Sequence, residues 1–334
     1  MPRMKVMEAV VKILESEGID HIFGIPGAAI LPFYDALRTS TRIRHLTVRH
    51  EEGATHAADG WSRATGNVGV AVGTSGPAGT NMITGLYTCL ADSIPIICIT
   101  GQAQRSVLHK EAFQAVDIVE IARPVTKWAV QVKEAAQMPW IFRRAFQIAR
   151  EGRPGPVLID LPLDVQLAEI EYDPEIDDPF PVHRAPPSRA RIRRAVEMLM
   201  DAERPIIVAG GGVIGANASP ELAAFAEYLQ IPVSPTLMAR GAIPHDHALF
   251  AGTVGIQTQQ KYANEIFLES DCVIAVGARF GDRHTGHWMS IAVPGSSSTS
   301  MSSRRRSARF SSRTWASSAT RHSRWRTCSP SPAT

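Results

Sequence analysis

The order of apolar and polar residues predicts alternating helices and strands in the first half of the chain. Apolar residues recur at helical spacing from Lys5 to Glu17, and Gly18 follows as a candidate C-cap. Continuous apolar runs between helices indicate a parallel sheet covered on both faces. The predicted strands are HIFGIPG (21–27), IRHLTV (43–48), NVGVAVG (67–73), IPIICIT (94–100) and PVLIDLP (156–162), and helices are predicted at 51–63, up to about 91, and at 134–150.

A stretch rich in Pro and Asp separates this pattern from a second one. Residues 166–189 contain YDPEIDDPFPVHRAPPS and are typical of a linker between domains. The sequence therefore predicts an α/β protein with two doubly wound parallel-sheet domains, at 1–165 and 190–286. In the second, helices are predicted at 191–202 and 219–229, and strands at 205–211 (PIIVAGG), 232–237 (PVSPTL) and 271–280 (DCVIAVGARF).

Composition and charge exclude several classes of protein. The 334 residues are 44% hydrophobic and 20% charged, which suits roughly two domains with sizeable cores. The net charge of +3 arises in the last 48 residues; the first 286 carry 27 basic and 32 acidic residues, a net charge of −5. This body shows no electrostatic footprint for nucleic acid. No apolar run is long enough to span a membrane and no signal peptide is recognisable, so we expect a cytoplasmic protein.

Several chemical signatures are absent from the sequence. The four cysteines form no CxxC pair, and no His/Cys cluster has zinc-site spacing, so neither a disulfide scaffold nor a structural zinc site is predicted. The GxSxG and HExxH motifs of serine hydrolases and zinc proteases do not occur.

Three local patterns are candidates for chemistry, each with a plainer alternative. GTSGPAGTN (73–81) puts a glycine-rich turn where backbone N–H groups can face an anion or a polar ring, although a tight connection suits it equally. AGGGV (209–213) resembles a dinucleotide-binding turn but lacks the GxGxxG spacing. RHEEG (49–53) places two carboxylates at the start of a predicted helix, where the helix dipole alone favours acids.

Taken together, five segments resemble thiamine-diphosphate-dependent carboligases and occur in the same order. They are FGIPGAAILPFYDAL, RHEEGATHAADGWSRATG, GTSGPAGTN, HKEAFQAVDIVEIARPVTKW and GRPGPVLIDLPLDVQ. Over residues 1–286 the chain is similar to the N-terminal half of glyoxylate carboligases (tartronate-semialdehyde synthases), and next to acetolactate synthase large subunits. The resemblance implies a first domain that binds the aminopyrimidine of thiamine diphosphate and a middle domain that holds FAD. It also implies a third domain, which binds the diphosphate through Mg²⁺.

The resemblance assigns roles to individual residues. Glu51 matches the glutamate that hydrogen-bonds the pyrimidine ring and favours the imino tautomer, which acts as a base toward the thiazolium carbon. Phe113 and Gln114 match the pair near the reacting carbon. The loops that line the pyrimidine contain Pro26, Gly27, Ser75, Gly76 and Asn81; the residues that fall at FAD contacts are Arg153, Gly211, Gly212, Thr236, Leu237, Met238, Gly277 and Arg279. No metal ligand is assigned, because the GDG…Asn motif for Mg²⁺ does not occur in the sequence.

The implied activity is the decarboxylating condensation of small 2-oxo acids, with two glyoxylate molecules giving tartronate semialdehyde and CO₂, by a homodimer or homotetramer. An acetolactate synthase acting on pyruvate is the first alternative, and Glu51 favours it because glyoxylate carboligases usually carry Val at this position. A non-catalytic FAD-binding or interaction fragment is the alternative of another class. Since the diphosphate-binding domain is missing, we expect this chain alone to be inactive.

The chain changes character at His287. Fifteen of the last 48 residues are Ser, eight are Arg, and none is Lys or an acid. A disordered basic tail is one interpretation. A shift of reading frame is the other, because regrouped codons for 298–307 permit HVDVEPTQI, which resembles the strand after the GARF segment in the carboligases. We expect residues 287–334 to be an irregular, frameshifted tail that leaves the middle domain incomplete.

Overall fold

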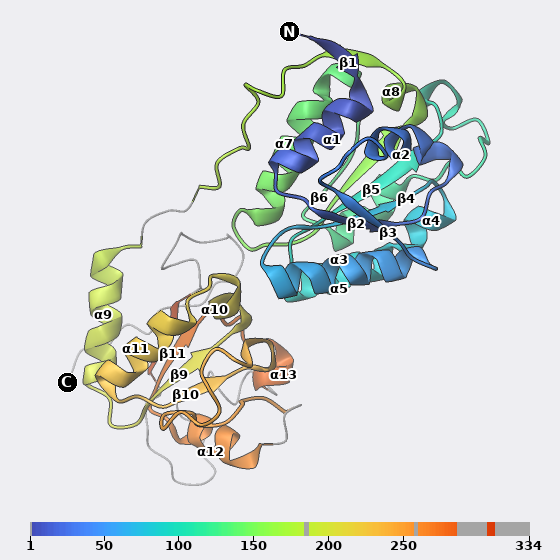
Figure 1. Cartoon of the computed structure of the whole chain (residues 1–334). Coiled ribbons are helices and arrows are strands. Elements are labelled where there is room, and N and C mark those ends of the chain that lie inside the picture. Colours follow the sequence, from blue (N-terminus) through green and yellow to red (C-terminus); the bar gives the residue numbers. More distant parts are fainter. Residues whose placement is uncertain (1, 184–186, 257–259, 286–305, 311–334) are drawn as a thin grey trace, which may run out of the picture. The chain divides into compact units, whose positions relative to one another are not determined.

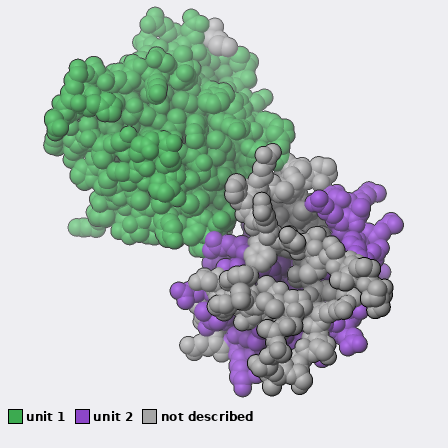
Figure 2. Space-filling view, turned by 180° about the vertical axis from the view of Figure 1, so that it is seen from behind, with its two compact units in different colours: residues 1–183 green, residues 184–334 purple. Residues whose placement is uncertain are grey.

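The computed structural model describes residues 2–183, 187–256, 260–285 and 306–310. The chain folds into two compact units (Figures 1 and 2). Unit 1 contains residues 1–183 and unit 2 contains residues 184–334. Both are built on parallel sheets with helices, so the predicted α/β class is confirmed.

A six-stranded, all-parallel sheet forms the centre of unit 1, in the order β3-β2-β4-β5-β7-β6. Three of its strands are buried along their whole length, which is why their sequences are continuous apolar runs. These are β4 (Gly69–Gly73), β5 (Ile96–Gln102) and β7 (Val157–Pro162); the others are β2 (His21–Gly24), β3 (Arg44–Thr47) and β6 (Trp128–Gln131).

Helices cover both faces of this sheet (Figure 1). One core cluster draws its helical residues mainly from α1 (Val6–Ser16), α2 (Leu31–Leu37) and α7 (Met138–Arg150). A second cluster, on the opposite face, draws on α3 (Glu51–Thr65), α5 (Ile83–Asp92) and α6 (Ile118–Ala122). The short helices α4 (Pro77–Asn81) and α8 (Leu163–Gln166) follow β4 and β7.

The first and last strands of unit 1 pair with each other. β1 (Arg3–Lys5) and β8 (Glu169–Glu171) form a two-stranded antiparallel sheet, and Tyr172 N–H donates to the Pro2 carbonyl at 3.0 Å. Residues 166–183 were expected in a linker, but in the structure they lie within unit 1. The remaining residues of the predicted linker belong to unit 2.

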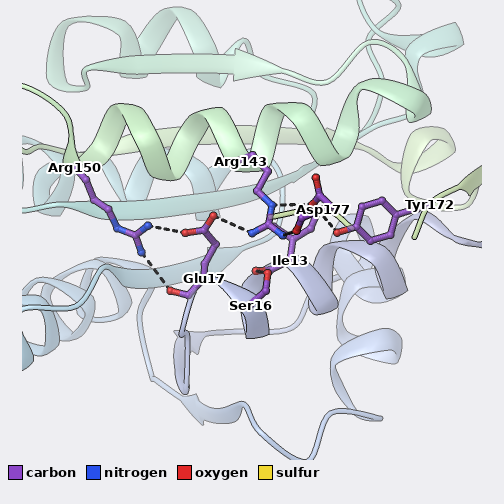
Figure 3. A network of polar contacts seen from close by, with 7 residues as sticks. All are labelled: Ile13, Ser16, Glu17, Arg143, Arg150, Tyr172 and Asp177. Atoms are coloured by element: carbon purple, nitrogen blue, oxygen red, sulfur yellow. Dashed lines mark hydrogen bonds and ion pairs between the residues drawn. The ribbon is translucent and has the colours of Figure 1, made fainter. Parts of the chain in front are cut away.

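A buried ionic network explains why this segment is held (Figure 3). The Arg143 side chain is only 1% exposed; its Nη1 lies 2.9 Å from Glu17 Oε1 and its Nε lies 2.8 Å from Asp177 Oδ2. Arg150 Nη1 binds the other Glu17 oxygen at 2.6 Å, and the Tyr172 hydroxyl donates to Asp177 at 2.7 Å. The network thus ties α1, α7 and the segment after β8 together.

Unit 2 is a smaller parallel sheet in the order β10-β9-β11-β12. The strands are β9 (Pro205–Ala209), β10 (Val233–Pro235), β11 (Cys272–Val276) and β12 (Arg306–Phe310). The helices are α9 (Arg189–Met200), α10 (Gly211–Gly215), α11 (Ser219–Leu229), α12 (Lys261–Glu269) and α13 (Asp282–Thr285). The strand predicted at 205–211 ends at Ala209, because Gly210 turns the chain into α10.

β12 lies in the segment expected to be irregular. It pairs in parallel with β11, from Cys272 opposite Arg306 to Val276 opposite Phe310. Within the segment expected to be irregular, these five residues form a strand; the rest of 287–334 lies outside the described residues. In the described part of the chain, no helix has both the length and the apolar character of a membrane span.

Candidate cofactor site

The candidate site of unit 1 lies where parallel strands end at a reversal of strand order. β2 and β4 are neighbours, but the chain leaves β2 for β3 on one side and leaves β4 for β5 on the other. In open α/β sheets, ligands bind at the carboxyl ends of the strands at such a switch point. Pro26 and Gly27 follow β2, Glu51 follows β3, and Ser75 and Gly76 follow β4.

Glu51 is held by a side chain from another element. It is the first residue of α3, whose N-cap residue is His50. Asn81, the last residue of α4, donates from Nδ2 to Glu51 Oε2 at 3.0 Å. The neighbouring acid has a different partner, since Glu52 Oε1 lies 3.6 Å from His56 Nε2. The structure therefore separates the two carboxylates of RHEEG and aims Glu51 toward the glycine-rich turn after β4.

Two glycines allow the loops around Glu51 to touch. A Cβ atom on Gly27 would lie 2.6 Å from the Cβ of Thr74, so a side chain there would push the loops after β2 and β4 apart. Gly76 has φ +61°, and a Cβ on it would lie 2.7 Å from the Cβ of Gln114. The loop that carries Gln114 thus contacts the turn after β4.

Phe113 and Gln114 lie on the loop 103–117, between β5 and α6. Gln114 adopts the left-handed region with φ 56°, as do His109 (65°) and Glu111 (55°) in the same loop. The Phe113 side chain is 81% exposed. An apolar ring held in solvent on a loop beside a candidate site suits a ligand or a partner better than a core. Pro26 is likewise exposed, whereas Ser75 is buried.

The residues present suit the pyrimidine end of thiamine diphosphate. A carboxylate fixed by Asn81, between loops whose glycines admit close approach to the backbone, can accept a hydrogen bond from a flat nitrogen ring. Among the described residues, no group of three His, Cys, Asp or Glu side chains is placed to hold a metal ion.

The residues expected at FAD fall into two sets. In unit 2, the loops after β9, β10 and β11 come together: Gly212 N–H donates to Gly277 O at 3.2 Å, and a Cβ on Gly211 would lie 3.1 Å from the Cβ of Met238. Gly277 is left-handed, with φ +66°. Thr236 is buried, while Leu237, Met238 and Arg279 are exposed. This glycine-lined sheet edge suits an extended ligand such as a dinucleotide.

Arg153 belongs to the other set, because it lies in unit 1. Its guanidinium donates to the carbonyl oxygens of Leu90 (2.7 Å) and Ala91 (2.8 Å) and to Ser93 Oγ (2.6 Å). Ala91 lies in the last turn of α5, and Ser93 is its C-cap. A cation here stabilises the carbonyl end of the helix.

Sequence reasoning missed Asp160, a fully buried carboxylate in the middle of β7. Thr100 Oγ1 donates to its Oδ1 at 2.8 Å, and Gln131 Nε2 donates to its Oδ2 at 2.8 Å. Both neighbours stand directly opposite it, on β5 and β6. The signal was an acid inside the apolar run PVLIDLP, because buried charges are rare unless they have partners.

Asp160 gives the stability of unit 1 a specific pH dependence. Burial raises its pKa from 3.8 to about 6, although hydrogen bonds from Gln131, Thr100 and Gln102 oppose the shift. Because the folded pKa exceeds the unfolded one, the folded state alone keeps the proton between about pH 4 and 6, and stability falls as the pH rises. Relative to Asp160→Asn, we expect the wild-type free energy of unfolding to fall by about 2 kcal/mol from pH 4 to pH 7. Urea unfolding at both pH values measures this; an unchanged difference between the two proteins would contradict it.

Comparison with known proteins shows the family to which this chain belongs. Residues 4–121 match the N-terminal TPP-binding domain of thiamine pyrophosphate enzymes, and residues 192–305 match their central domain. The chain belongs to this family, of which it contains the N-terminal and central domains.

Within this family, the chain is similar to glyoxylate carboligases and to acetolactate synthase large subunits. The chain is 58% identical to the glyoxylate carboligase of Escherichia coli O157:H7 over 287 residues, which cover 86% of this chain and 48% of that protein. It is 47% identical over 288 residues to a probable acetolactate synthase large subunit of Methanocaldococcus jannaschii (85% and 48%). It is 45% identical over 286 residues to the acetolactate synthase large subunit of Corynebacterium glutamicum (85% and 46%). The chain spans about half the length of these relatives.

Proposed function

We propose that this chain supplies the pyrimidine-binding and central domains of a carboligase that condenses two glyoxylate molecules to tartronate semialdehyde and CO₂. The observation that supports this most is the 58% identity to a glyoxylate carboligase over 86% of the chain. The carboxylate of Glu51, fixed by Asn81 at the switch point of the sheet, supports thiamine diphosphate chemistry in general and does not distinguish glyoxylate from pyruvate in favour of glyoxylate.

In this proposal thiamine diphosphate supplies the carbon nucleophile and the electron sink for the decarboxylation. Glu51 holds a proton at the pyrimidine nitrogen, and Asn81 keeps the carboxylate in place. Phe113 and Gln114 border the space for the 2-oxo acid. The glycine-lined edge of unit 2 holds FAD, and the enzyme acts as a homodimer or homotetramer.

Acetolactate synthase is the second candidate, and Glu51 is the residue that favours it, because an aliphatic residue usually stands there in glyoxylate carboligases. A non-catalytic FAD-binding fragment is a third, supported by the lack of a metal-holding cluster among the described residues.

The test is a completed chimera, in which residues 1–285 are joined to the part of the E. coli O157:H7 glyoxylate carboligase that follows its matched segment. We expect CO₂ release from glyoxylate to exceed that from pyruvate by roughly ten- to 200-fold in kcat/KM, because the extra methyl group of pyruvate must be accommodated. Preference for pyruvate would favour the acetolactate synthase assignment, and no release from either would favour the non-catalytic fragment.

The chain without the added half is the control. With thiamine diphosphate, Mg²⁺ and FAD added, we expect no sustained CO₂ release from either acid. The diphosphate needs Mg²⁺ held by carboxylate or amide ligands, and a pyrimidine pocket alone does not offset the cost of association. Release above that of a Glu51→Ala variant would show that the site is built differently.

A further inference from the structure

The loop 103–117 needs an anchor, since its conformation is not one that its residues prefer. Three non-glycine residues, His109, Glu111 and Gln114, occupy the left-handed region within six positions. Such residues persist only where the surroundings determine them. The helix that follows the loop, α6, begins at Ile118 and packs on the same face of the sheet as Leu158.

The first end of the loop is held by an acid that follows β7. Asp164 Oδ1 accepts from the Arg105 backbone N–H at 3.0 Å, and its Oδ2 accepts from Arg105 Nε at 2.7 Å. This contact fixes both the backbone and the side chain of Arg105.

The other end of the loop is held by Asp160 of β7, which acts through a glutamine. Gln102, the last residue of β5, is 1% exposed. Its Nε2 donates to Asp160 Oδ2 at 3.2 Å and to the Val116 carbonyl at 2.9 Å, while its Oε1 accepts from Ala103 N–H at 3.0 Å. All hydrogen-bonding atoms of this amide are therefore engaged, and only one orientation of the amide satisfies them.

We propose that Asp160 is a positioning residue for Phe113 and Gln114, acting through the Gln102 amide on the Val116 carbonyl. A carboxylate can only accept, so it turns the Gln102 NH₂ group toward itself, and the second N–H of that group then points at the loop. Val116 lies two residues from Gln114, whose Cβ is already in contact range of Gly76. That the positions of Phe113 and Gln114 matter for catalysis rests on the proposed function. That Asp160 determines these positions does not depend on it.

Hydrogen exchange on the chain tests the proposal with matched variants. Gln102→Met and Gln131→Met each remove one amide donor from the same Asp160 oxygen, but only Gln102 also binds the loop. We expect Gln102→Met to speed exchange of the Lys110, Ala115 and Ile118 amides roughly three- to tenfold, the effect of one lost hydrogen bond. These N–H groups bond to carbonyls within the loop or at its end. Gln131→Met should leave them unchanged, and amides of β4 should be unchanged in both.

Equal exchange at the three amides in Gln102→Met and the wild type would overturn the proposal, and so would equal acceleration in both variants. If Gln102→Met does not fold, Asp160→Leu replaces it, because leucine has the same number of side-chain heavy atoms, cannot accept a hydrogen bond and leaves Gln102 in place. It should also speed exchange in the loop, and unchanged exchange there would again overturn the proposal. Since no cofactor or substrate is present, this outcome is independent of whether the proposed function holds.

Discussion

Replacing Glu51 with glutamine in the completed chimera is expected to slow proton exchange at C2 of bound thiamine diphosphate by roughly 10²- to 10⁴-fold, the worth of one general acid–base contact. Glutamine keeps the size of the side chain and still accepts the hydrogen bond from Asn81, which in the wild type is 3.0 Å long. It cannot share a proton with the pyrimidine nitrogen. The exchange rate is measured by quenching the enzyme in acid after mixing with D₂O and recording the proton spectrum of the cofactor.

Glu52→Gln is the matched control for this experiment. Glu52 is the next residue of the same helix and also half-buried, but its carboxylate faces His56. We expect its exchange rate to equal that of the wild type. If Glu51→Gln were as fast as Glu52→Gln, both acids would only be complementing the positive end of the α3 dipole.

Replacing Arg143 with methionine is expected to lower the free energy of unfolding of unit 1 by about 3–5 kcal/mol, because breaking a buried ion pair leaves an uncompensated charge. The Glu17 side chain is 1% exposed and would keep only Arg150 as a cationic partner within this network (Figure 3). Asp177 would lose two hydrogen bonds, one to its carboxylate and one to its backbone carbonyl. Urea unfolding at pH 7 measures the loss.

Arg144→Met makes the same substitution one position along α7. Arg144 is 39% exposed and lies 3.8 Å from Glu151, so we expect a change of no more than about 0.5 kcal/mol. A loss in Arg143→Met as small as this would mean that the protein relaxes around Glu17. Arg143→Met should also make residues 173–183 easier to cleave by proteases, which the control should not.

The sequence predicted β5 and β7 from continuous apolar runs, and the burial of both strands is complete. A continuous apolar run is typical of a parallel strand buried on both faces of its sheet. β6 was not predicted, because it is a four-residue strand at the edge of the sheet and is half-buried throughout. β1 and β8 were not predicted because each has three residues and is defined by the other, more than 160 residues away.

The sequence predicted which residues belong to the candidate site better than it predicted the contacts between them. Glu51 and Asn81 were both identified by resemblance, but the hydrogen bond between them could be found only once α4 and the start of α3 were placed together. The local alternative, an acid complementing the helix dipole, also describes where Glu51 lies, since it is the first residue of α3. The role of Gln102 could not be predicted from the sequence, because nothing distinguishes a glutamine at the end of a strand. Its role depends on the two hydrogen bonds that its NH₂ group donates in the folded structure.

The pairing of β1 with β8 brings the first and last strands of unit 1 together, with Pro2 and Tyr172 joined by a hydrogen bond. A domain whose ends meet can be inserted into another protein, duplicated or circularly permuted without interrupting its core. The ionic network around Arg143 also holds the segment after β8, as far as Asp177, against unit 1. A transferable module therefore includes the residues after β8 as well as the sheet. A graft cut at residue 165 would lose both the β1–β8 pairing and Asp177, one of the two acidic partners of the buried Arg143.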